Sequence, residues 1–299
     1  MKAWRAGWLR ADAALLIVAA VWGFTFTAVQ RALESASPFA FLSARFALAA
    51  VVLGAAFPRR VVRVTGRQLA VAALLGTWLT AGYALQTVGL LYTTASKSAF
   101  ITGLSVVLVP LLWLLMSARF HDGRAGGAGL KPLVAAAIAA AGLYLLASPA
   151  GAGPNVGDLL TLGCAAGFAL HIVTAGCVAR RQDPAALAFW QIVATALACA
   201  ALMSVLETPR LALTLWTLAA LVVTGVLATA FAFATQMWAQ RETSATHVAL
   251  IFAAEPVFAA VFAHFVQGDR LGLRGIAGGA LILAGIAVAQ LWSVRPRPR

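Results

Sequence analysis

The sequence predicts an all-α polytopic membrane protein, with ten transmembrane helices arranged as two five-helix repeats of inverted topology. Three observations support this fold class: an apolar composition, ten apolar segments of spanning length, and prolines that recur at one spacing. Of the 299 residues, 62% are hydrophobic and 10% are charged, whereas soluble proteins carry about 25% charged residues. A lipid bilayer is the environment in which so apolar a surface is stable.

Ten apolar segments are each close to the roughly 17–25 residues that cross a bilayer as a helix. We place them at residues 13–32, 38–57, 68–91, 95–117, 130–148, 155–178, 184–206, 214–238, 243–266 and 273–293. Pro38 and Pro184 open the second and the seventh segment, where proline is tolerated because it stands in the first helical turn. Glycine-rich turns at 123–129 and 150–157 separate further segments.

Prolines mark corresponding positions in the two halves of the chain. Pro256 follows Pro110 by 146 residues, and Pro184 follows Pro38 by the same number. The residues on either side of Pro110 and Pro256 also resemble each other. The shared offset indicates an internal duplication, and internal repeats in an apolar chain are typical of secondary transporters.

The distribution of lysine and arginine predicts how the segments are oriented. With the N-terminus inside, 16 of the 22 Lys and Arg residues flank the inner ends of the segments, 5 flank the outer ends, and Arg45 lies within a segment. This asymmetry places both termini in the cytoplasm. Because each half has five segments, the second half, residues 151–299, is inverted relative to the first, residues 1–150. Inverted repeats allow a carrier to expose a central site to each side in turn.

The charge and the cysteines argue against other classes of site. The net charge is +13, but the basic residues stand mainly at the ends of apolar segments. We therefore expect membrane lipids, and no nucleic acid, as partners. Cys164, Cys177 and Cys199 lie inside apolar segments, and an odd number of cysteines without a CxxC motif argues against a disulfide framework and a zinc site. We expect no metal and no cofactor.

Short motifs follow one another along the chain in a characteristic order. They are Trp22-Gly23-Phe24, Ser37-Pro38-Phe39, Ala44-Arg45-Phe46, Tyr83-Ala84-Leu85-Gln86, Tyr92-Thr93-Thr94-Ala95, Val109-Pro110, Glu255-Pro256-Val257-Phe258 and Gly268-Asp269-Arg270-Leu271. In this order they resemble the EamA family of ten-span carriers in the drug/metabolite transporter superfamily, over essentially the whole chain. The resemblance implies export of metabolites or drugs across a bacterial-type inner membrane. We expect the branch that exports aromatic and other neutral amino acids.

Three charged residues are candidates for substrate binding. Arg45 lies about 10 Å below the outer surface at 1.5 Å per residue, where it could hold a substrate carboxylate, bridge two helices or extend to the headgroups. Lys97 opens the fourth segment and could meet a substrate carboxylate or anchor the helix end. Glu255 lies near the middle of the ninth segment, where it could carry a proton during transport or hold a fixed hydrogen bond.

Neutral polar residues inside the segments are further candidates. Tyr83 and Gln86 are three residues apart and share a helix face, so they could line a cavity or join two helices by hydrogen bonds. Gln236, and Gln191 at the 146-residue offset from Arg45, leave the same two alternatives open. His171 lies in the middle of the sixth segment and could titrate during transport or serve as a hydrogen-bonded packing residue.

Tryptophans and small residues complete the set. Five tryptophans are candidate cavity walls: Trp22, Trp78, Trp113, Trp190 and Trp238. Gly275 and Gly279 form a GxxxG motif in the tenth segment, and residues 135–142 make the fifth segment equally slim, a composition typical of close helix packing. The family resemblance implies that these two segments lie apart from the transport path, as scaffold or as dimer contacts.

Other functions fit the sequence less well. A membrane-embedded enzyme needs a nucleophile with a base, a metal motif such as HExxH or paired aspartates at membrane depth, and the sequence presents none, so we expect no enzymatic activity. A channel does not require an inverted duplication. A nucleotide-sugar carrier would need a denser basic cavity. A multidrug or other-metabolite exporter of the same superfamily is the closest alternative. Proton coupling and the choice between a monomer and a weak homodimer stay open.

Overall fold

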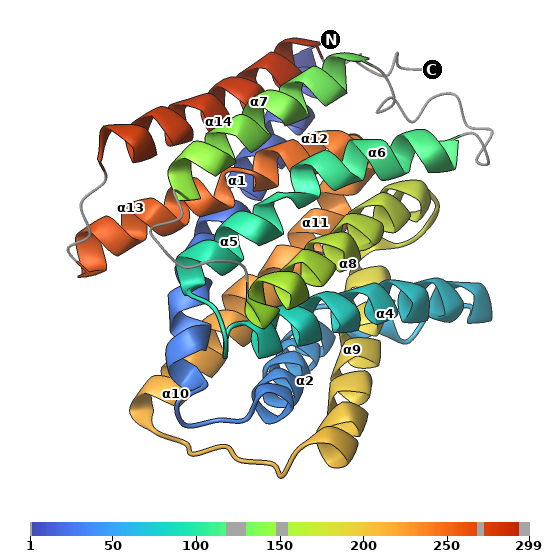
Figure 1. Ribbon diagram of the computed structural model, residues 1–299. Helices are drawn as coiled ribbons and strands as arrows, with labels where there is room; N and C mark the ends of the chain where they lie inside the picture. Colours follow the sequence, from blue (N-terminus) through green and yellow to red (C-terminus); the bar gives the residue numbers. More distant parts are fainter. Residues whose placement is uncertain (1, 118–129, 148–154, 268–271, 293–299) are drawn as a thin grey trace.

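The protein is an all-helical bundle in a computed structural model that describes residues 2–117, 130–147, 155–267 and 272–292 (Figure 1). Within these ranges the one extended pairing is a single antiparallel bridge between Ala36 and Leu211. The Gly268–Leu271 motif and the glycine-rich turn at 123–129 lie outside the described residues. The helices agree with a polytopic membrane protein.

A helix, or a series of helices, covers each of the ten predicted segments. The first half contains α1 (Lys2–Ala32), α2 (Pro38–Ala56), α3 (Pro58–Val61), α4 (Gly66–Gly89), α5 (Ala95–Gly103), α6 (Ser105–Ser117) and α7 (Leu130–Ala147). The second half contains α8 (Val156–Val178), η1 (Ala179–Arg181), α9 (Pro184–Leu206), α10 (Leu215–Val222), η2 (Val223–Phe231), α11 (Ala232–Glu242), α12 (Ala245–Phe252), α13 (Glu255–Gln267) and α14 (Leu273–Trp292).

Eight helical stretches of the described chain are long and apolar enough to cross a membrane. The apolar parts of α7 and α14, Leu130–Leu145 and Leu273–Ala289, are shorter, so the total of ten spans stays a prediction. The first helix begins at Lys2 rather than near residue 13. Because residues 2–11 contain no proline and are rich in Ala and Arg, the helix continues beyond the apolar segment.

Side-chain caps fix where several helices begin. Thr65 and Gln68 form a capping box at the start of α4, and Asn155 and Asp158 form another at the start of α8. The carboxylate of Asp183 accepts hydrogen bonds from two backbone N–H groups in the first turn of α9. These caps satisfy backbone donors that would otherwise lack partners at a helix start.

Three predicted segments are interrupted rather than continuous. The fourth divides at Leu104 into α5 and α6, and the ninth divides after Phe252 into α12 and α13. A proline inside a helix removes one hydrogen bond and clashes with the preceding turn, and Pro110 and Pro256 follow the two divisions. In the eighth segment, the π-helix η2 lies between α10 and α11. The pairs α5–α6 and α12–α13 run in opposite directions (Figure 1).

The helix contacts recur in corresponding pairs. The helix α4 packs against α8 and α9, and the segment formed by η2 and α11 packs against α1 and α2. Likewise, α8 contacts α5 and α6, while α1 contacts α12 and α13. Three further contacts join corresponding predicted segments of the two halves: α2 with α9, α6 with α12, and α7 with α14.

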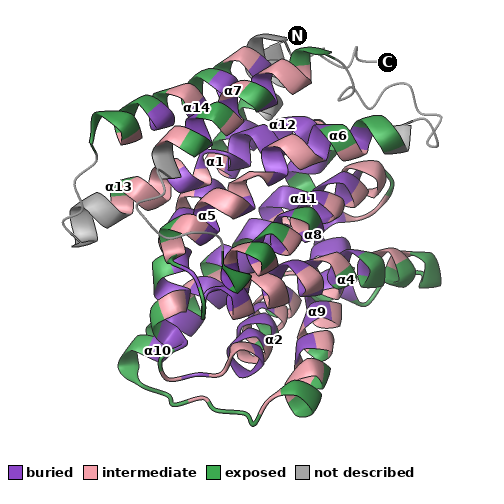
Figure 2. Cartoon of the chain, viewed as in Figure 1, coloured by how far each residue is buried: buried purple, intermediate pink, exposed green. Residues whose placement is uncertain are grey.

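Exposed residues lie along the outer helices and at helix ends (Figure 2), and many of these residues are apolar. Large hydrophobic side chains are exposed on helices throughout the bundle, among them Leu74, Leu115, Leu197 and Leu283. In water such a surface would drive association, whereas hydrocarbon chains solvate it. Many of the buried residues are alanine or glycine, and these small side chains let the helices approach closely.

The closest packing of α7 against α14 depends on small residues. A Cβ atom on Gly142 would lie 2.6 Å from the carbonyl oxygen of Gly278, and one on Gly285 would lie 2.9 Å from that of Ala135. A Cβ on Gly279 would instead be in ordinary contact with Val257, at 3.7 Å. The expected slim face at 135–142 is therefore used, with Gly285 rather than Gly279 opposite it.

We expect Gly142→Ala to destabilise the protein by roughly 1–3 kcal/mol, because the new methyl group forces the two backbones apart. Gly279→Ala is the matched control. There the methyl group has room, and alanine favours a helix by about 1 kcal/mol over glycine. Thermal unfolding of both variants in detergent measures the difference, and equal midpoints would show that the α7–α14 contact is adaptable.

Candidate functional site

A cavity lies between helices of both halves and encloses about 700 Å³ of empty space, its mouth included. Seven of the nine predicted site residues line it: Trp22, Arg45, Tyr83, Gln86, His171, Gln236 and Glu255. Trp78 and Lys97 are not among its lining residues. The helices that contribute to it are α1, α2, α4, α8, α11 and the interrupted pairs α5–α6 and α12–α13.

The guanidinium of Arg45 is buried in this core, with only 2% of the residue exposed. Its Nε donates a hydrogen bond of 2.8 Å to the hydroxyl of Thr229, and its Nη2 donates one of 3.3 Å to the hydroxyl of Tyr83. The guanidinium carbon also lies 4.5 Å from the ring centre of Tyr83. Among the described residues no carboxylate lies within ion-pair distance of Arg45. The cation is thus held by neutral groups and remains available to an anion.

Glu255 brings a carboxyl group to the same cavity. It is the first residue of α13, where the positive end of the helix dipole favours a negative charge. No described residue forms a hydrogen bond or an ion pair with its side chain. The cavity therefore contains one cationic and one acidic group, neither of which has an ionic partner in the described protein.

Aromatic rings form much of the remaining wall. The indole Nε1 of Trp22 donates a 2.7 Å hydrogen bond to the carbonyl of Ala228, and its ring centre lies 4.7 Å from that of Phe252. The rings of Tyr83 and Phe168 meet edge to face at 5.0 Å. Such walls bind apolar or aromatic groups and also attract cations.

Buried amides and an imidazole continue from the cavity into the protein. His171 Nε2 lies 2.8 Å from Oε1 of Gln191, and Gln236 donates a 3.0 Å hydrogen bond to Gln240. The Nε2 of Gln191 and the Oε1 of Gln236 are buried without a hydrogen-bond partner among the described residues. An unsatisfied buried polar atom costs about 1–3 kcal/mol. Of these two amides, Gln236 lines the cavity, so its oxygen is the one available there to a hydrogen-bond donor.

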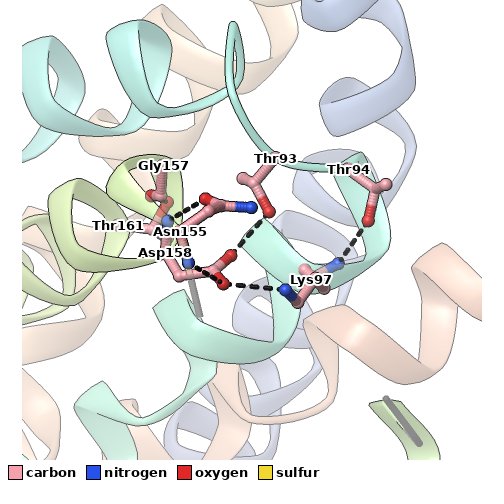
Figure 3. A network of polar contacts seen from close by, with 7 residues as sticks. All are labelled: Thr93, Thr94, Lys97, Asn155, Gly157, Asp158 and Thr161. Atoms are coloured by element: carbon pink, nitrogen blue, oxygen red, sulfur yellow. Dashed lines mark hydrogen bonds and ion pairs between the residues drawn. The ribbon is translucent and has the colours of Figure 1, made fainter. Parts of the chain in front are cut away.

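Two of the predicted residues lie elsewhere. Trp78 is half-buried on α4, where its carbonyl oxygen faces the contact with Gly167 of α8. Lys97 forms an ion pair with Asp158, with 2.7 Å between Nζ and Oδ2 (Figure 3). The ammonium group of Lys97 is therefore already paired with a carboxylate of the protein. A role of Lys97 in substrate binding stays a prediction.

Figure 3 shows the network that holds the Lys97–Asp158 pair. The hydroxyl of Thr93 donates a 2.7 Å hydrogen bond to Oδ1 of Asp158, and the backbone N–H of Asn155 donates one of 3.1 Å to Oδ2. Sequence reasoning missed Asp158, although the spacing Asn155-x-x-Asp158 is a signal for a helix start. The network joins the end of α4, the start of α5 and the start of α8.

A second pair resembles the first. His247 Nε2 lies 3.0 Å from Oδ1 of Asp12, and both side chains are less than a tenth exposed. Asp158 follows Asp12 by 146 residues, and His247 follows Lys97 by 150. Lys97 and His247 are each the third residue of an interrupted segment's first helix. Sequence reasoning overlooked Asp12 because it stands just outside the predicted first segment.

Other residues at the site could not be singled out from the sequence. Thr229, which holds Arg45, is one of many threonines in apolar segments. Phe168, Phe233 and Phe252 line the cavity, but nothing local distinguishes them among the 16 phenylalanines of the chain. Only the helix arrangement brings these side chains together.

Comparisons with known proteins agree with this arrangement. The EamA-like transporter family matches residues 9–147 and again residues 155–290. One protein of Archaeoglobus fulgidus, named an uncharacterized transporter, is 34% identical over 284 residues, which is 95% of this chain and 86% of its own length. A second from the same organism, with the same name, is 26% identical over 284 residues, covering 91% and 94%.

A solved structure shares the fold. It is described only as the crystal structure of a protein, and it aligns with a TM-score of 0.76 over 94% of this chain and 96% of its own, at 21% identity. At this identity the likeness concerns the fold alone. Because the family matches most of the sequence and a relative is 34% identical over 95% of it, this chain belongs to the EamA-like transporter family and is a membrane transporter.

Proposed function

We propose that this transporter exports neutral amino acids, aromatic ones included, across the inner membrane of a bacterial-type cell by alternating access. One observation carries the proposal: a single cavity contains Arg45 and Glu255, each without an ionic partner in the described protein, between aromatic rings. A zwitterion with an apolar side chain has groups that match all three features.

The match can be followed group by group. The substrate carboxylate would pair with the guanidinium of Arg45, since such pairs form two charge-assisted hydrogen bonds. The ammonium group would approach the carboxylate of Glu255 and the aromatic faces beside it. An apolar or aromatic side chain would pack against Trp22, Phe233 and Phe252, which also line the cavity. Burial of these groups together leaves no charge of a bound zwitterion unpaired.

Several observations support an inverted repeat, and with it alternating access. The family matches the chain twice in succession, and the helix contacts recur in corresponding pairs. Two polar side-chain contacts join opposite halves: Asp12 of the first half meets His247 of the second, and Lys97 of the first meets Asp158 of the second. The interrupted helices meet the cavity at corresponding places, with Ser105 and Glu255 as the first residues of α6 and α13.

The topology that we propose follows the lysine and arginine distribution. With ten spans and both termini in the cytoplasm, the starts of α5 and α8 lie at the outer side and the starts of α1 and α12 at the inner side. The Lys97–Asp158 pair then lies at the outer side and the Asp12–His247 pair at the inner side. The same kind of contact therefore closes opposite ends of the bundle.

Uptake of labelled phenylalanine, methionine and threonine into liposomes containing the purified protein tests the proposal. We expect saturable uptake that unlabelled neutral amino acids compete away. Arg45→Gln should reduce it by roughly one to two orders of magnitude, because a charge-assisted hydrogen bond contributes about 1.5–3 kcal/mol. Arg31→Gln, at an exposed arginine outside the cavity, is the matched control. If folded protein gives no uptake above empty liposomes while transporting aromatic drugs, the amino-acid proposal is wrong.

We also propose that Glu255 couples transport to protons, since a carboxyl group without a fixed partner can exchange a proton for the substrate ammonium group. We expect an imposed pH gradient to change the uptake rate of the wild type, and Glu255→Gln to abolish that change because the amide cannot titrate. Glu34→Gln, in the exposed turn that follows α1, should respond as the wild type does. Uptake that ignores the gradient in the wild type would indicate facilitated diffusion.

Charge exchange tests whether Lys97 serves structure or substrate. Lys97→Glu and Asp158→Lys each place two like charges together, so we expect each to lower the free energy of unfolding by about 1–3 kcal/mol. The double variant should recover the part of the loss that comes from like charges, but not the hydrogen bonds that Asp158 accepts from Thr93 and Asn155, and it should transport as the wild type does. The measurements are thermal unfolding in detergent and uptake. A stable double variant with lost amino-acid uptake would instead assign Lys97 to substrate binding.

A further inference from the structure

The middle of the eighth predicted segment departs from α-helical geometry. Residues Val223–Phe231 form a π-helix of nine residues, η2, and π-helical turns are rare and occur frequently at functional sites. The hydroxyl of Thr224, at its start, donates a 2.7 Å hydrogen bond to the carbonyl four residues back, at Ala220. The hydroxyl of Thr229 donates one of the same length to the carbonyl five residues back, at Thr224. The π-helical turn is wider than an α-helical one, and it therefore determines the orientation of the Thr229 hydroxyl.

Because the Thr229 hydroxyl donates its proton to the carbonyl of Thr224, it can only accept a hydrogen bond from Arg45. A threonine hydroxyl has one proton to donate and two lone pairs that accept. The proton of Thr229 is directed to the backbone of Thr224, so the hydroxyl oxygen presents lone pairs to the Nε of Arg45, 2.8 Å away. Both residues are buried, with Thr229 fully inaccessible. A hydroxyl in this position therefore restrains the plane of the guanidinium.

The restraint leaves one edge of the guanidinium available. A guanidinium has five N–H donors in a rigid fork. Thr229 accepts from Nε and Tyr83 accepts from Nη2, so two donors are used and the Nη1 donors form no hydrogen bond with a described residue. Arg45 lines the cavity. A carboxylate would then bind at the end of the fork, where Nη1 and Nη2 present parallel N–H groups.

The same π-helix contacts the aromatic wall and the backbone of α2. The carbonyl of Ala228, next to Thr229, accepts the hydrogen bond from the indole of Trp22. A Cβ atom on Gly225 would lie 3.1 Å from the carbonyl oxygen of Arg45, so η2 and α2 approach closely at this point. One short element therefore touches both the cationic and the aromatic part of the cavity.

We infer that Thr229 is a positioning residue, which orients the guanidinium of Arg45 so that its outer edge receives the carboxylate of the substrate. The inference rests on the proposed function, in which Arg45 binds that carboxylate. It adds that selectivity for a carboxylate depends on a hydroxyl that the substrate does not touch. The π-helix supplies the geometry by which that hydroxyl accepts from Arg45.

Competition by phenylalanine and by phenylalaninamide, which lacks the carboxylate, against labelled phenylalanine uptake tests the inference. We expect Thr229→Val to raise the half-inhibitory concentration of phenylalanine roughly tenfold, as for one lost orienting hydrogen bond, and to leave that of phenylalaninamide unchanged. Thr229→Ser keeps the hydroxyl and should restore the wild-type ratio within about twofold. Thr224→Val, at a buried threonine of the same π-helix that does not touch Arg45, is the matched control.

Comparing Arg45→Gln with Thr229→Val distinguishes a failure of the inference about Thr229 from a failure of the proposed function. If Arg45→Gln removes the preference for phenylalanine over phenylalaninamide and Thr229→Val does not, the inference about Thr229 is overturned while the proposed function stands. If Arg45→Gln leaves the preference unchanged, Arg45 does not bind the carboxylate and the proposed function fails. A loss shared equally by Thr229→Val and Thr224→Val would reduce Thr229 to a packing role.

The role of Thr229 can also be tested without a substrate, by measuring how fast Arg45 is chemically modified. This measurement decides the inference even if phenylalanine does not bind. Phenylglyoxal modifies accessible arginines, and peptide mass analysis quantifies the modification of Arg45 itself in membranes. We expect Thr229→Val to change the rate at Arg45 severalfold by freeing the guanidinium, with Thr229→Ser and Thr224→Val near the wild-type rate. An unchanged rate in Thr229→Val would contradict a positioning role.

Discussion

A guanidinium buried inside a membrane-embedded core is the group to which the central helices are fitted. Such a charge is expensive unless it is paired or solvated by the protein. Arg45 has no carboxylate partner among the described residues, and it is solvated by a threonine hydroxyl, a tyrosine hydroxyl and an aromatic face. These groups come from η2 and α4, so three elements must keep their register for the charge to be tolerated. Neutral solvation keeps the cation in place and leaves it free for an anion.

Interrupted helices bring backbone and polar groups to the cavity at the same depth. In hydrocarbon every backbone N–H and C=O group needs a partner, so irregular backbone is tolerated only inside protein or beside a polar cavity. The divisions between α5 and α6 and between α12 and α13 lie at the cavity, and η2 adds a third departure from the α-helix. The positions of Ser105, Glu255 and Thr229 follow from these departures. Regular helices through the same residues would turn their side chains to other faces.

The ends of the bundle are held by different chemistry from the middle. Asp12 with His247 and Asp158 with Lys97 join helices that are distant in sequence, and the small residues of α7 and α14 allow those helices to approach closely. The cavity between the ends contains two ionisable groups, Arg45 and Glu255, that have no ionic partner among the described residues. Groups that are paired stabilise the helix ends, while groups without an ionic partner are available to a ligand.

The sequence by itself determined the class of the protein, the positions of its apolar helical segments and most of the predicted residues that line the cavity. Composition and apolar length decide solubility in a bilayer, and a charged or amide side chain inside an apolar segment must face the protein interior. Seven of the nine residues selected by their chemistry and their place in the segments line one cavity. These criteria could not separate Lys97 or Trp78 from the other seven, since they do not give the rotation of a helix or its neighbours.

Only the tertiary structure decided which groups are paired and which are free. The contacts of Asp158 with Lys97, of Asp12 with His247 and of Thr229 with Arg45 join segments that are up to 235 residues apart in the chain. The π-helix that directs Thr229 was not predicted either. Local sequence has no signal for such contacts, because they depend on how whole helices rotate and approach. The sequence gives the chemistry of each side chain. Helix packing decides that Arg45 is surrounded by neutral hydrogen-bond acceptors and so stays available to an anion.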